Sequence, residues 1–286
     1  MVQCGRFFSL YCFERRFVTE FIELSQAAQL IKDSSTIALG GMTIYRRPVT
    51  FVLELLRRDP RPRDLTLLNF TAGYESDLLV GAGCVSTVRS VYFGLESFGF
   101  APMFTGAANA GKITIMEETE ASIVMGLRAK TAGVSFMPSH AWIGTDLPRL
   151  RPDVKTVVDP YTGETLMAFP SISIDVAVLH GLEADSEGNV KLNNNLGIDK
   201  ELIYVSDLII ATVERIVDRV EKSADGIIAP APTIQYIALA PHGAWPTSCY
   251  PNYPVGGGEL MRYVDACNAG EFEDYLAQML KTNPAG

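Results

Sequence analysis

The sequence predicts an α/β protein built on an open, mostly parallel sheet flanked by helices. Short β-branched and apolar runs alternate with longer amphipathic segments, and this alternation favours parallel strands joined by helical crossovers. The 286 residues, of which 48% are hydrophobic and 20% charged, are sufficient for a substantial core. Because no linker rich in Pro, Gly or Ser divides the chain, we predict one domain over residues 24–286, after a poorly ordered N-terminal extension at residues 1–23.

Helices and strands follow in order from residue 25. We predict helices at residues 25–32, 48–58, 75–82, 120–132, 198–206 and 270–281. We predict strands at residues 36–39, 65–70, 90–93, 113–116, 134–137, 176–180, 208–212 and 227–229. An Asp-Pro and a Thr-Gly pair between residues 159 and 164 predict a turn that joins two short strands as a hairpin at one side of the sheet.

The composition excludes several classes of protein. A net charge of −9 argues against general binding of nucleic acids or anionic membranes, and no apolar run approaches the ~18 residues that cross a bilayer. The five cysteines are scattered, without the paired spacing of a zinc site or a disulfide framework, so we expect a reducing, cytoplasmic setting and no metal. The high apolar content suggests additional apolar surface for a protein partner.

One buried strand ends in a polar loop that carries candidate catalytic groups. After the apolar run that ends at Leu179 come His180, Glu183, Asp185 and the turn pair Gly188-Asn189. Ligands of open α/β sheets bind beyond the carboxyl ends of such strands. A structural histidine at a strand end is equally common, so both the catalytic and the structural interpretation stay open.

Two further segments lie between a predicted strand and a helix. Gly40 and Gly41 precede a helix whose N-terminus, with the two backbone N–H groups, could form an anion or oxyanion cradle; a tight βα turn is the alternative. Arg46 and Arg47 either pair with a phosphate or carboxylate or are solvated surface charges.

An acidic cluster precedes and begins the helix predicted at residue 120. Glu117, Glu118 and Glu120 are explained by the helix dipole alone, which favours carboxylates in a first turn. The same position would also expose a carboxylate to the crevice at the strand ends.

In the segment Pro-His-Gly-Ala-Trp-Pro-Thr-Ser-Cys-Tyr, Ser248 and Cys249 lack a nucleophile-elbow motif, so we expect a buried, unreactive cysteine.

Four segments together resemble a known family. They are the βα unit at residues 25–58, the Phe-Met-Pro and Gly-Thr-Asp-Leu motifs within 134–147, the Asp-Val-Ala-x-x-His strand with its Ala-Asp-x-x-Gly-Asn turn within 174–192, and the segment 241–250. In this order they resemble the A (alpha) subunit of family I coenzyme A transferases, of the glutaconate CoA-transferase type. The third segment then reads as a family signature, with Asp185 and its turn structural and His180 a secondary candidate.

The resemblance implies the A chain of an acyl-CoA:carboxylate CoA-transferase that consists of two homologous subunits, with an open α/β fold. Such enzymes pass CoA through a thioester on a glutamate of the homologous B (beta) subunit. Here Glu75-Ser76 and Glu96-Ser97 lack the Asn-Gly of that nucleophile motif, so the partner is expected to supply the glutamate. The expected substrates are a CoA thioester and a carboxylic acid, with no permanently bound cofactor.

A second branch of the family leaves an alternative function. The A chains of steroid ring-cleaving hydrolases use an acidic residue of their own, and that position matches Glu120, the expected catalytic residue here. The expected substrate-binding residues are Gly40, Gly41, Arg46, His140 and His180. His140 stands where relatives often carry Arg, which puts anion pairing there in doubt. A non-catalytic binding relative is the third alternative.

Overall fold

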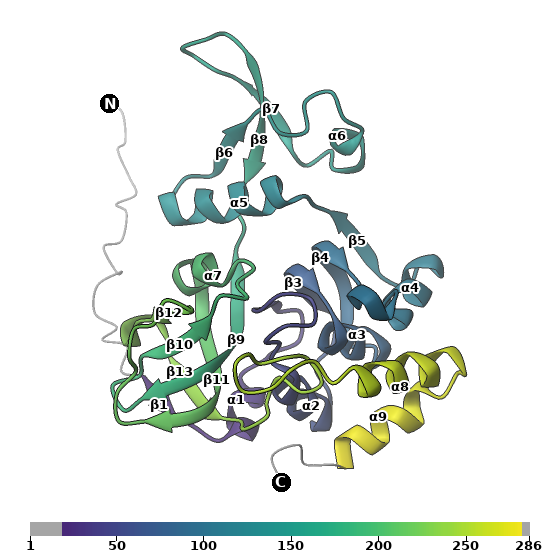
Figure 1. Cartoon of the computed structure of the whole chain (residues 1–286). Helices are drawn as coiled ribbons and strands as arrows, with labels where there is room; N and C mark the ends of the chain where they lie inside the picture. The colour runs from purple at the N-terminus through teal and green to yellow at the C-terminus, as the bar shows by residue number, and fades with distance from the viewer. Residues whose placement is uncertain (1–18, 282–286) are drawn as a thin grey trace, which may run out of the picture.

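The computed structural model describes residues 19–281 and is built around a twisted sheet (Figure 1). Within these residues the sheet has ten strands, eight of them in the order β1-β13-β11-β9-β2-β3-β4-β5, and every neighbouring pair along this path is parallel. Strands β10 and β12 extend it as an antiparallel pair beside β9. The strands are β1 (Glu20–Phe21), β2 (Thr36–Leu39), β3 (Leu65–Ala72), β4 (Val85–Phe93), β5 (Thr114–Glu117), β9 (Ile174–Asp185), β10 (Val190–Asn193), β11 (Ser206–Val217), β12 (Gly226–Ala229) and β13 (Tyr236–Leu239).

Helices cover both faces of this sheet and bury two separate clusters of side chains. One cluster joins α1 (Leu24–Gln29), α2 (Val49–Arg57), α3 (Tyr74–Gly81), α8 (Gly257–Asn268) and α9 (Phe272–Lys281) to the sheet, and the other joins α5 (Glu120–Ala132) and α7 (Asp199–Val205). Alternation along β9 explains this, because Val178 points into the first cluster and Leu179 into the second. The mostly parallel, helix-flanked sheet confirms the predicted fold class.

A second sheet of three antiparallel strands projects from α5 (Figure 1). It consists of β6 (Phe136–Ser139), β7 (Lys155–Val158) and β8 (Thr165–Pro170) in the order β6-β8-β7, with α6 (Leu147–Leu150) beside it. We call residues 136–170 the arm. Its small core joins Trp142 and Phe169, whose rings meet edge to face at 5.0 Å. The prediction that the hairpin at 159–164 lies at the side of the main sheet is therefore wrong, because β7 and β8 pair with β6 instead.

Other differences concern individual helices and strands. The sequence prediction missed β10, β13 and α8, as well as α4 (Pro102–Asn109), η1 (Glu96–Phe98) and η2 (Ala231–Thr233). Glu20 and Phe21, assigned to the extension, pair with β13 at the edge of the sheet, whereas residues 1–18 lie outside the described chain. In residues 19–281 no helix is long and apolar enough to cross a membrane.

Candidate functional site

The carboxyl ends of the parallel strands lie side by side along one end of the main sheet, and Gly40 and Gly41 follow β2 there. The N–H of Gly40 donates to the carbonyl of Val178 at 2.9 Å, and the N–H of Gly41 donates to Asp199 at 3.1 Å. Gly41 adopts φ +81°, and a side chain there would collide with the carbonyl of Arg46. In this conformation both N–H groups are occupied, which fits the tight βα turn and leaves no ready-made oxyanion cradle.

Arg46 is fully buried and serves the interior of the chain. Its guanidinium pairs with the buried Asp199 at 2.7 Å and also donates to the side chain of Asn193 and the carbonyls of His180 and Asn195. All three nitrogens are engaged, so the interpretation of Arg46 as a solvated surface charge is wrong. The carboxylate that it pairs with is Asp199 of the same chain, and a role of Arg46 in substrate binding stays a prediction. The arginine joins β9, β10 and the start of α7 behind the turn at Gly41.

Arg47 forms a second buried ion pair, with Glu75, which makes this glutamate unavailable as a nucleophile. Its Nη2 lies 2.6 Å from Glu75 Oε1, and both side chains are fully buried. Arg47 also donates to Asn69, and Ser76 donates to the same oxygen of Glu75. A carboxylate held in this way cannot approach a thioester in solution. Glu96, the other glutamate followed by Ser, lies exposed in η1, where it adopts φ +55°.

His180 is buried where β9 passes β11, and both ring nitrogens have partners. Nδ1 lies 2.8 Å from the hydroxyl of Thr212, and Nε2 lies 2.8 Å from Oε1 of Glu214. A neutral ring that donates from Nε2 to Glu214 and accepts at Nδ1 from Thr212 satisfies all three groups. Burial lowers the pKa of His180, although Glu214 works in the opposite direction, so the neutral ring dominates at pH 7. This arrangement supports the structural interpretation.

Glu214 organises a closed network around this histidine. Burial works to raise its pKa, but the contacts with His180, Tyr253 and the backbone of His242 together outweigh that effect, and the pKa lies below its ordinary value. The hydroxyl of Tyr253 donates to Oε1 at 2.5 Å, and the backbone N–H of His242 donates to Oε2 at 2.7 Å. The network therefore fixes the loop that follows β13. Sequence reasoning missed Glu214, although Thr212 and Glu214 are polar residues at every second position of an apolar strand.

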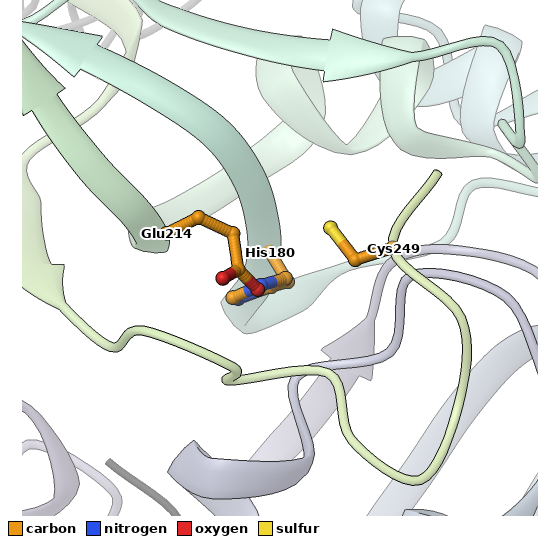
Figure 2. A group of neighbouring side chains, drawn as sticks. All are labelled: His180, Glu214 and Cys249. Carbon is orange, nitrogen blue, oxygen red and sulfur yellow. The ribbon is translucent and has the colours of Figure 1, made fainter. Parts of the chain in front are cut away.

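Cys249 completes the one group in the described chain that has the composition of a metal site. A ligand atom from each of His180, Glu214 and Cys249 lies within 4.8 Å of the other two (Figure 2). Burial raises the pKa of the Cys249 thiol to about 12, so it is protonated at neutral pH, whereas metals bind the thiolate. His180 and Glu214 form a hydrogen bond with each other. The donors are thus satisfied without an ion, and the buried cysteine agrees with the unreactive role expected from the sequence.

The acidic cluster divides into one buried and two exposed carboxylates. Glu118 is buried and accepts from Arg89 at 2.5 Å and from Arg151 at 2.8 Å, and Ser122 also donates to it. Glu117 and Glu120 are exposed, and Glu120 begins α5 immediately after its N-cap, Thr119. The buried member therefore attaches the arm, whereas the carboxylate of Glu120 is open to solvent.

The arm meets the main sheet beside this carboxylate, and His140 is exposed on the arm. Trp142 of the arm donates from its indole nitrogen to Thr119 at 2.9 Å, and this bond fixes the arm at the start of α5. His140 is 71% exposed, and its Nε2 is 3.6 Å from Glu164 of the same arm. Glu120 and His140 are thus exposed whereas His180 is buried, and no hydrogen bond or ion pair within residues 19–281 joins the three.

Most of the chain matches a family of known proteins. The model of the coenzyme A transferase family covers residues 21–240. The chain belongs to the coenzyme A transferase family. This membership confirms the resemblance seen in the sequence, and it supports the prediction of a CoA-transferase enzyme.

Curated relatives include chains of transferases and of hydrolases. The chain is 31% identical over 240 residues to the A chain of 3-oxoadipate CoA-transferase from Pseudomonas knackmussii, and the match covers 82% of this chain and 84% of the relative. It is 30% identical over 266 residues to the cholesterol ring-cleaving hydrolase IpdA subunit of Mycobacterium tuberculosis, covering 86% and 87%. Both branches considered from the sequence are thus represented among its relatives.

Solved structures with similar folds belong to proteins of different activities. The decarboxylase AibA/AibB matches with a TM-score of 0.85 and 29% identity over 93% of this chain and 99% of that chain. Glutaconate coenzyme A-transferase from Acidaminococcus fermentans matches with a TM-score of 0.78 and 26% identity over 93% and 94%. Proteins of different activities therefore share this fold, so the reaction must be inferred from the residues of the site.

Proposed function

We propose that this protein is the A chain of an acyl-CoA:carboxylate CoA-transferase that consists of two homologous subunits. The observation that carries the proposal is the family match over residues 21–240, together with relatives that are themselves named as A chains of CoA-transferases. The state of the glutamates supports a partner. Glu75, Glu118 and Glu214 are held in contacts with arginine or histidine. Glu96, Glu117 and Glu120 are exposed, but none is followed by the Asn-Gly of the family's nucleophile motif, so we assign the covalent step to a glutamate of the second, homologous chain.

In this proposal the reaction proceeds in two halves. The partner glutamate attacks the acyl-CoA thioester and forms a mixed anhydride with the acyl group as the CoA thiolate leaves. The thiolate then attacks the glutamyl carbonyl of this anhydride, so that a glutamyl-CoA thioester forms and the first carboxylate is released. A second carboxylic acid then takes the CoA and releases the glutamate. This chain provides one wall of the cleft at the strand ends, and Glu120 orients or polarises the acyl group from its exposed position at the start of α5.

The alternative function is hydrolysis of a CoA-thioester ring substrate, with Glu120 as general base toward water. The IpdA relatives favour this alternative, and so does the exposed position of Glu120. A general base contributes about 10²–10⁴-fold in rate, so its loss would be easy to measure. The two functions differ in the acceptor, which is a carboxylate in one and water in the other.

A coupled exchange assay tests the proposal. The chain is co-expressed with its partner, and the complex is incubated with an acyl-CoA and an isotopically labelled carboxylic acid. We expect labelled acyl-CoA to form, with ping-pong kinetics, only when both chains are present. Thioester consumption without labelled product would favour hydrolysis, and a complex that does neither would support a non-catalytic relative.

A further inference from the structure

A second polar region lies at the amino ends of the parallel strands, where β3 and β4 begin. A cleft of about 820 Å³ opens there between residues 56–63, the turn at residues 82–84 and Leu280 near the end of α9. Gly41 and Glu120 lie at the carboxyl ends of the strands, on the opposite side of the sheet from this cleft. The cleft is thus separate from the proposed site of acyl transfer.

The cleft collects positive charge in a chain whose net charge is −9. Four arginines line it, Arg57, Arg58, Arg61 and Arg63, whereas Asp59 is the one carboxylate among its lining residues. Of the four, Arg57 pairs with Glu54, and Arg63 lies 3.7 Å from Asp33, a long contact between exposed groups. Arg58 and Arg61 have no carboxylate partner within residues 19–281.

Neutral carbonyl groups hold these two arginines in place. Nη1 of Arg58 donates to the carbonyls of Ala28 and Ile31 at 3.1 and 2.6 Å, and Nε of Arg61 donates to the carbonyl of Leu56 at 2.8 Å. A carbonyl carries only a partial charge, so each guanidinium keeps most of its positive charge and several N–H groups for a further acceptor. The capping of α1 explains Arg58, but it does not explain Arg61 or Arg63.

The segment that carries the arginines is constrained. Pro60 and Pro62 fix φ at two of its positions. At its end, the N–H of Arg63 donates to Asp33 at 3.0 Å, and the carbonyl of Arg63 accepts from Ser34 at 2.9 Å. A ligand would therefore meet arginines whose backbone is already held in place, which lowers the entropy lost on binding.

We propose that this cleft binds a small phosphorylated metabolite. The guanidinium fork matches the oxygens of a phosphate, and several arginines in one cleft suit a ligand with two or more phosphate groups. Leu56, Pro60 and Leu280 provide apolar surface against which the organic part of such a ligand packs. The net negative charge of the whole chain argues against a nucleic acid as the ligand.

Calorimetric titration with inorganic pyrophosphate at fixed ionic strength tests this proposal on the full chain in complex with its partner. We expect saturable binding to the wild type and at least tenfold weaker binding to Arg61→Gln. Arg63→Gln, at a residue whose side chain is 74% exposed, alters the cleft with little risk to folding and should also weaken binding severalfold. A second titration with ADP measures the organic part, since tighter binding than pyrophosphate would show that the apolar wall is used.

The matched control is Arg149→Gln, which removes an equally exposed arginine from the arm. We expect this variant to bind pyrophosphate like the wild type, and thermal unfolding of every variant confirms that it is folded. The proposal is overturned if neither probe binds the wild type at millimolar concentration. It is also overturned if the two cleft variants bind normally, or if Arg149→Gln weakens binding as much as they do.

Discussion

At the scale of single residues, burial separates the carboxylates that build the fold from those available to a substrate. Glu75, Glu118 and Asp199 each face an arginine in the interior, whereas Glu120 stands exposed at the start of α5. Residue type and spacing alone do not distinguish these roles, because a glutamate at a strand end fits either one. The sequence therefore does not predict the division of the acidic cluster into a buried attachment point and exposed carboxylates, and the catalytic role of Glu120 stays a prediction.

Glu120→Gln measures which chemistry this exposed carboxylate serves. If the reaction is CoA transfer through a partner glutamate, the variant should keep its exchange rate within about tenfold, because Glu120 only orients the substrate. Under the hydrolase alternative the rate should fall by about 10²–10⁴-fold. Glu117→Gln, at the neighbouring exposed position, is the matched control and should behave like the wild type in either case. An exchange rate reduced a thousandfold in Glu120→Gln alone would contradict the orienting role.

Arg46→Met tests the interior role assigned to that arginine. The substitution leaves Asp199 buried without its cationic partner, and we expect a loss of about 3–5 kcal/mol in the free energy of unfolding. Arg46→Met combined with Asp199→Asn removes both charges and keeps an acceptor for the N–H of Gly41, so it should lose less. Urea unfolding measures both variants. A single variant as stable as the wild type would instead return Arg46 to the list of substrate ligands.

At the scale of elements, helix α4 is joined to the rest of the fold by a buried carboxylate. Asp77 of α3 accepts from the N–H groups of Met103 and Phe104 at the start of α4, and from the hydroxyl of Tyr263 in α8. Burial raises the pKa of Asp77 to about 6, although these hydrogen bonds lower it in part. The folded chain therefore keeps a proton that the unfolded chain releases from about pH 4 upward.

The stability contributed by Asp77 should therefore fall as the pH rises. The contribution of its bound proton is fully present below pH 4 and lost as the pH passes through about 6. Relative to Asp77→Asn, the wild type should lose on the order of 2 kcal/mol in the free energy of unfolding between about pH 4.5 and 7.5. The comparison uses urea titrations of both proteins at each pH. A constant difference between them would show that Asp77 keeps an ordinary pKa.

The elements also show how far the sequence predicts this fold. Long apolar strands such as β9 and the amphipathic helix α2 were found because burial imposes a clear period on their residues. By contrast, α4 has no buried residue, and α8 begins with two glycines, which are typical of turns and disfavour a helix. The arm was assigned to the main sheet because hydrophobic alternation predicts strands without naming their partners.

At the scale of the whole molecule, the arm presents apolar side chains to solvent. Tyr161 is 95% exposed, Val158 62% and Leu150 61%, and all three lie outside the small core of the arm. Three such side chains on one projecting element make the arm the candidate surface for a protein partner. This agrees with the apolar partner surface expected from the composition, and with an A chain that works beside a second chain.

Val158→Asp should therefore weaken assembly with the partner while leaving the isolated chain folded. We expect at least a tenfold weaker association, because a charge at a buried interface position loses its hydration. Lys155→Ser lies on the same strand, and alternation places it on the opposite face, so it serves as the control. Light scattering after size-exclusion chromatography measures the assembly. Unchanged association of Val158→Asp would place the partner elsewhere on the chain.

The candidate site was predictable only in part, because its geometry depends on groups from distant parts of the sequence. The spacing of Gly40 and Gly41 indicated a βα turn, but not that Asp199, 158 positions after Gly41, occupies its N–H. His180 was visible in its strand, whereas its partner Glu214 comes from β11. Such pairings follow from the order of strands in the sheet, which local patterns do not determine.

Trapping the covalent intermediate tests the central claim most directly. The complex of this chain and its partner is treated with acyl-CoA and then with borohydride, which reduces a thioester but leaves a free carboxylate unchanged, and both chains are mapped by mass spectrometry. We predict one reduced glutamate in the partner and none in this chain. A reduced glutamate in this chain, or a complex that turns over acyl-CoA with no glutamate reduced in either chain, would contradict the account.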